Sequence, residues 1–119
     1  MKKLLLIAVI LVASISAHAQ TVNDIPVKDI DVDYFMIIGS SNFSGTKMKV
    51  QFDFGQSHKF LGTSKNMVLK DENGKPMLLN SMVDALNFVS EFGYKFQTWE
   101  TERSGDKMYY GILVKKKRN

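Results

Sequence analysis

The residues that could do chemistry in this chain are few and do not converge. Beyond the first twenty residues there is one histidine, His58, and the 119-residue sequence contains no cysteine. Zinc and iron sites need several nitrogen, sulfur or carboxylate ligands together, so we expect neither metal. A small hydrolase that uses His58 stays open as an alternative, although no G-x-S-x-G motif accompanies this histidine.

Acidic residues offer two further kinds of chemistry. Glu100 and Glu102 have the residue types of a glycosidase carboxylate pair, but both fall on one side of one predicted strand, where they serve as charge at a sheet edge. The aspartates at positions 24, 29, 31 and 33 lack the glycine turn and terminal glutamate of a calcium loop. Glycine-rich nucleotide-binding motifs are absent from the sequence. We therefore predict a non-enzymatic protein with no catalytic residues, no metal and no cofactor.

Residues 1–19 have the layout of a signal peptide. Two lysines precede an apolar run from Leu4 to Ile15, and the small residues of Ala17-His18-Ala19 follow. The run is shorter than the roughly 20 residues of a membrane-spanning helix, which argues against an anchor. We expect cleavage after Ala19, a mature chain that begins at Gln20 without a transmembrane segment, and a secreted or periplasmic location.

Positive charge is concentrated at the C-terminus. The formal net charge is +4, of which Lys2 and Lys3 supply two charges, and residues 115–118 read KKKR. Such a run attracts nucleic acid or anionic lipid. Because no second basic cluster supports it, a solubilising strand end is the simpler interpretation, and we do not expect nucleic acid as a partner.

The mature chain predicts one α+β domain. Residues 20–33 are polar with scattered aliphatics and contain Pro26, which indicates an extended N-terminal arm. Ser81 and Asp84 form a capping pattern that begins a helix, and Gly93 ends it. Period-two alternation and turn residues predict strands over residues 34–38, 48–54, 67–69, 77–79, 94–103 and 107–115. This order lacks a βαβ rhythm, so residues 34–119 are expected to form a mostly antiparallel sheet with a single helix packed on one face.

The first of these strands differs from its neighbour. Residues 34–38 read YFMII and are apolar on both faces, which is typical of a strand covered on both sides. In the next strand Met48, Val50 and Phe52 alternate with polar residues, so only one face is expected to be buried.

The helix-to-strand junction resembles a family of small bacterial domains of unknown function. The family signature runs roughly LN-x-L-G-x-x-G-W-E, and Leu86-Asn87, Val89-Ser90 and Gly93-Tyr94 match its positions, with Phe96 following. Ser90, Tyr94 and Lys95 depart from the glycine, tryptophan and glutamate of that signature. The resemblance implies a sheet with one helix and carries over no catalytic residue. The leader, cut before glutamine, also resembles those of exported proteins of the Bacteroides group.

The last hairpin contains the candidate binding residues. If residues 104–106 form a three-residue loop, Arg103 faces Lys107, Phe96 faces Val114, and Trp99 lies over Gly111. Tyr109 and Leu113 are then diagonal to the indole, on the face away from the helix. Either the N-terminal arm covers this aromatic cluster, or a partner does.

These observations predict a secreted or periplasmic non-enzymatic domain that binds a protein or glycan through the sheet face around Trp99, Tyr109 and Leu113. The alternative is a structural module that self-associates as a homodimer through the same face or an edge strand.

Overall fold

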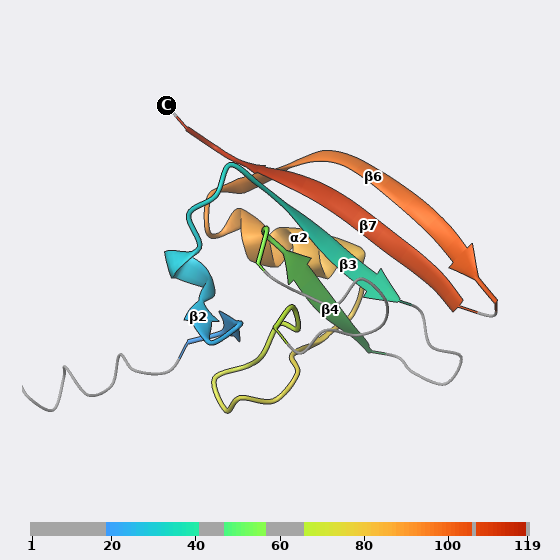
Figure 1. The fold of residues 1–119 in the computed structure, drawn as a ribbon, viewed down its shortest axis with the longest axis horizontal. Coiled ribbons are helices and arrows are strands. Elements are labelled where there is room, and N and C mark those ends of the chain that lie inside the picture. The colour runs from blue at the N-terminus through green and yellow to red at the C-terminus, as the bar shows by residue number, and fades with distance from the viewer. Residues whose placement is uncertain (1–18, 41–46, 57–65, 106, 119) are drawn as a thin grey trace, which may run out of the picture.

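The chain folds as an α+β domain, which confirms the predicted fold class. The computed structural model describes residues 19–40, 47–56, 66–105 and 107–118. Within them, one α-helix packs on one face of an antiparallel five-stranded sheet (Figure 1). The strand order is β5-β4-β3-β7-β6. The elements are β3 (Tyr34–Ser40), β4 (Met48–Asp53), β5 (Leu78–Leu79), α2 (Met82–Ser90), β6 (Tyr94–Ser104) and β7 (Lys107–Lys116).

The hydrophobic core lies between α2 and one face of this sheet, here called the inner face. Alternate residues of the central strands point into it, and Ala85 and Val89 enter it from the helix. Leu86 of the helix is only partly buried and packs against the core. The buried residues of the central strands are Phe35, Ile37, Val50, Phe52, Ile112 and Val114.

Helix α2 begins where its sequence predicts, but it ends at Ser90 with Glu91 as the C-cap, so the predicted end at Gly93 is three residues too late. The Ser81 hydroxyl accepts a hydrogen bond from the Asp84 backbone N–H at 3.2 Å, as expected for an N-cap. The Asp84 carboxylate in turn accepts from the Asn80 backbone N–H. Gly93 has φ of +86°, a conformation that favours glycine, and the chain turns there into β6.

The N-terminal segment packs on the same side of the sheet as the helix. Strands β1 (Thr21–Val22) and β2 (Ile25–Pro26) form a small hairpin, followed by a 3-10 turn at Val27–Asp29. Both residues of the hairpin turn, Asn23 and Asp24, have positive φ, which these residue types tolerate. Val22, Val27 and Ile30 are buried in the same core as α2. The segment is therefore part of the inner layer and does not cover the opposite face of the sheet.

The Tyr94 side chain connects the N-terminal segment to the sheet through hydrogen bonds and ring packing. Its side chain is 1 % exposed, and its hydroxyl lies 3.0 Å from the Ile30 carbonyl oxygen and 3.2 Å from that of Val32. Its ring packs edge-on against Phe35 at a centroid distance of 4.6 Å. Burial of the hydroxyl raises the pKa of Tyr94, because the charged phenolate would lose solvation.

The register of the last hairpin differs from the predicted one. Ser104 pairs with Lys107, so the connection has two residues and includes Gly105 with φ of +62°. A bulge between Phe96 and Thr98 then shifts the register by one residue. The predicted pairing of Phe96 with Val114 is confirmed, but Trp99 faces Ile112 and not Gly111.

Candidate functional site

The register change separates the predicted binding residues. Ile112 is buried in the core, so its cross-strand neighbour Trp99 lies on the inner face. Tyr109 and Leu113 alternate with Ile112 along β7 and therefore lie on the opposite face, here called the outer face. The prediction that Trp99, Tyr109 and Leu113 form one cluster is wrong. The physical reason is that a one-residue shift in a strand moves a side chain to the other side of the sheet.

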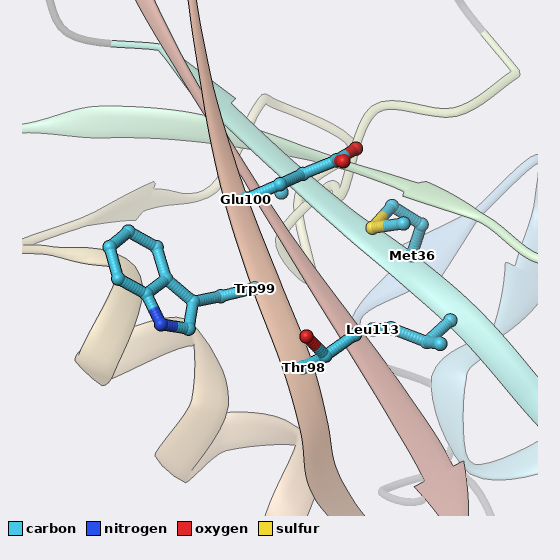
Figure 2. Close-up of a pocket in the computed structure, with 6 residues that line it drawn as sticks. Met36, Thr98, Trp99, Glu100 and Leu113 are labelled. Carbon is cyan, nitrogen blue, oxygen red and sulfur yellow. The ribbon is translucent and has the colours of Figure 1, made fainter.

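Trp99 is nevertheless strongly exposed. Its exposed fraction is 63 %, and it belongs to the edge strand β6, of which only Tyr94 is buried. Its side chain projects toward the side of the sheet that carries α2 (Figure 2). The sequence leaves open whether the N-terminal arm covers the indole, which the structure shows to be exposed, and it places the indole on the wrong face.

The outer face has an apolar centre. Met36 and Ile38 of β3 lie there because Phe35 and Ile37 between them point into the core. Met36 pairs with Leu113 across the two central strands, so their side chains are neighbours, and Ile38 lies beside Gly111. Tyr109, which is 38 % exposed, continues this surface along β7. Within the part of the chain that the structure describes, no helix or strand layer packs over these residues (Figure 1).

A small hollow of about 110 Å³ opens in this face over Gly111. Met36, Thr98, Glu100 and Leu113 line it, together with Trp99, whose indole points to the other side of β6 (Figure 2). Glu100 is the cross-strand partner of Gly111. A Cβ atom at Gly111 would lie 3.3 Å from the Met36 sulfur and 3.5 Å from Glu100 Cγ. The space above Gly111 is thus bordered by Met36 and Glu100 and not by the predicted indole of Trp99.

Polar residues surround the apolar centre. A second, smaller hollow beside Tyr109 includes Lys49 and Gln51 of β4 among its lining residues. Glu100 and Glu102 lie on the outer face of β6, opposite Gly111 and Tyr109. The outer face therefore has aliphatic and aromatic side chains in the middle and charged side chains on both flanks.

The possible catalytic and metal-binding groups do not assemble into a site. Among the described residues, no three histidine, cysteine, aspartate or glutamate side chains are grouped so as to hold a metal ion. Arg118 donates to the carboxylates of Asp31 and Asp33, at 3.1 and 2.6 Å, which gives these two acids a structural role. These ion pairs also raise the pKa of Arg118. His58 and residues 1–18 lie outside the described residues.

Comparisons with protein-family models, curated protein sequences and solved structures found no match to this chain. In the described part of the chain, no helix is long and apolar enough to cross a membrane.

One signal in the sequence identifies the outer face. The run YFMII predicts a strand covered on both sides, and β3 has this pattern, with Phe35 and Ile37 buried and Met36 and Ile38 on the outer face. The tryptophan is the more conspicuous residue in the sequence, but it is the methionine and isoleucine of β3 that mark the apolar surface.

Proposed function

We propose that this chain is an exported, non-enzymatic binding domain that docks a protein partner on the outer face of its sheet. One observation carries the proposal. β3 is apolar on both faces, but described elements of the chain cover only the inner one. Met36, Ile38 and Leu113 are partly buried by their neighbours in the sheet, and Tyr109 beside them is exposed. An apolar surface without a covering element marks an interaction site on many proteins.

The composition of the face favours a protein over a glycan. Sugar binding by stacking would use a large aromatic plane, but the only tryptophan lies on the inner face, and the outer-face tyrosines Tyr34 and Tyr109 lie toward its two ends and not at its apolar centre. The centre of the outer face holds Met36, Ile38 and Leu113, with Glu100 on one flank and Lys49 on the other. Aliphatic, methionine and tyrosine side chains inside a charged rim match the anatomy of protein–protein interfaces.

Export is supported by the three-part leader and by the structure near the expected cleavage point. The Gln20 carbonyl accepts a hydrogen bond from the Val27 N–H at 2.9 Å, and Thr21 exchanges backbone hydrogen bonds with Lys70. Cleavage after Ala19 would thus leave an N-terminus whose first residues take part in the fold.

Site-specific photo-crosslinking in cells that naturally export the protein tests the proposal. The photoreactive residue benzoylphenylalanine replaces Tyr109 on the outer face or, as the control, Val83 on the exposed side of α2, where 65 % of the side chain is exposed. We expect a protease-sensitive adduct from position 109 and none from position 83.

Leu113→Asp, placed at the centre of the outer face, should abolish this adduct while the variant still unfolds cooperatively in urea. A protease-resistant adduct would indicate a glycan in place of a protein. Equal adducts at positions 109 and 83, or an adduct unaffected by Leu113→Asp, would refute docking on the outer face.

The second candidate is self-association, favoured by the edge strand β6. This strand has 11 residues, pairs with β7 on one side, and is exposed at every position after Tyr94. Long exposed edges are templates for pairing with another chain. Light scattering during size-exclusion chromatography separates the candidates, because a dimer mass supports self-association and a monomer mass supports a different partner.

A further inference from the structure

A basic hollow lies at one end of the outer face, where β3 begins and β7 ends. Its volume is about 520 Å³, and one carboxylate and five cationic side chains line it beside a tyrosine: Asp33, Tyr34, Lys95, Lys115, Lys116, Lys117 and Arg118. We propose that this hollow binds a compact multivalent oxyanion, a ligand with two or more phosphate or sulfate groups. The proposal does not depend on protein docking at the centre of the face.

The strand register brings like charges together in this hollow. Lys95 of β6 is the direct cross-strand partner of Lys115 of β7, and Tyr34 pairs with Lys115 on its other side. Direct cross-strand neighbours have Cβ atoms about 5 Å apart, and like charges at such positions destabilise a sheet. An oxyanion between the two ammonium groups would convert this repulsion into attraction.

No carboxylate of the described residues neutralises these lysines. Asp33, which lines the hollow, and Asp31 beside it form ion pairs with Arg118, and no described carboxylate forms an ion pair with Lys95, Lys115 or Lys117. The Lys115 ammonium lies 5.5 Å from the centre of the Tyr34 ring, in a cation–π contact that leaves its charge uncompensated. The hollow therefore keeps an excess of positive charge.

The backbone beneath the lysines is fixed by the fold. The Lys116 N–H donates to the Asp33 carbonyl and the Lys117 N–H to the Gly93 carbonyl, both at 2.8 Å. Lys117 follows Lys115 by two residues, a spacing of about 7 Å along an extended chain. One oxyanion group can thus contact Lys95 and Lys115 while a second contacts Lys117.

Charge elsewhere on the outer face favours a compact ligand over a long polyanion. Glu100 and Glu102 follow Lys95 along the outer side of β6, and they would repel an anionic chain lying along the strand. Without the leader lysines the formal net charge falls from +4 to +2, so no broad positive field is available. Extended nucleic acids and anionic membranes gain affinity from many charge contacts, whereas this hollow offers few.

The test is calorimetric titration of the mature chain with inorganic triphosphate at low ionic strength. The variant Lys95→Gln/Lys115→Gln removes the facing pair. The control Lys75→Gln/Lys107→Gln removes the same charge from exposed lysines outside the hollow. We expect the first variant to bind about tenfold or more weakly, since each charge-assisted contact contributes on that order. The control should bind like the parent.

Removing like charges that face each other should not impair folding, and a melting temperature at or above that of the parent checks this. An absence of triphosphate binding by the parent, or an equal loss of affinity in both variants, would overturn the site. Binding to single-stranded DNA or to phosphatidylglycerol vesicles could instead be tighter than binding to triphosphate, with the same dependence on Lys95 and Lys115. That result would refute the proposal that the ligand is a compact oxyanion.

Discussion

Replacing Tyr94 by phenylalanine tests how the N-terminal segment is held. The substitution keeps the buried ring against Phe35 and removes only the hydroxyl, which bonds to the Ile30 carbonyl and accepts from the Val32 N–H at 3.4 Å. A partner group left without its bond in a buried site costs about 1–3 kcal/mol. We therefore expect the free energy of unfolding to fall by about 2 kcal/mol.

Urea unfolding of the mature chain measures this loss, with Tyr109→Phe as the matched control. Tyr109 is 38 % exposed on the outer face, so its variant should remain within about 0.5 kcal/mol of the parent. Hydrogen exchange should also quicken at Val27 and Lys70 in Tyr94→Phe, because their amides bond to Gln20 and Thr21 of the segment. Equal urea midpoints for the two variants would contradict a stabilising role of the Tyr94 hydroxyl.

The same hydroxyl predicts how stability depends on pH. Burial raises the pKa of Tyr94 above its ordinary value of 10.0, so the folded chain keeps this proton at a pH where the unfolded chain loses it. The contribution of the protonated Tyr94 hydroxyl to the free energy of unfolding is fully present below pH 10 and is lost as the pH rises through the folded-state pKa. Stability should therefore fall above pH 10 in the parent and fall less in Tyr94→Phe. Identical alkaline profiles would contradict this assignment.

Three shorter predictions concern export, the helix end and the indole. N-terminal sequencing of the exported protein should begin at Gln20, and an intact Met1 on exported material would contradict the signal peptide. Gly93→Ala should lower the free energy of unfolding in urea by about 1 kcal/mol or more, because residue 93 has φ of +86°, even though there is space for a Cβ atom. Gly93→Asn should lower it less, because asparagine tolerates positive φ better. Trp99→Ala should change the free energy of unfolding by no more than about 1 kcal/mol and leave the photo-crosslinked adduct from position 109 intact. Loss of that adduct would show that the indole takes part in binding.

The sequence predicts those features of the fold that depend on local chemistry. The cap at Ser81 and the alternation in β4 follow from neighbouring residues, and both are present. Gly93 has the predicted positive φ, although the helix ends before it. A turn forms at Asp71–Lys75, where Gly74 has φ of +78°, but residues 67–69 form no strand and β5 pairs with β4. Local signals of this kind are sufficient to predict one helix on an antiparallel sheet.

The candidate site depends on register, which no local pattern specifies here. The loop after Ser104 is one residue shorter than predicted, and the bulge at Gln97 restores the original pairing at Phe96. Between these two points every side chain of β6 faces the side opposite to the predicted one. Gln97 has no sequence feature that indicates a bulge, so the sequence pattern predicts Trp99 opposite Gly111, where the structure has Glu100.

The position of β7 in the sheet has a consequence for when the protein can fold. This strand is the last in the sequence, yet it lies between β3 and β6 and supplies Ile112 and Val114 to the core. Until residues 107–116 have been synthesised, β3 lacks one of its two neighbours and β6 lacks its pairing partner. Completing this sheet therefore requires pairing between segments far apart in the sequence, such as β3 with β7, and long-range pairing of this kind forms slowly.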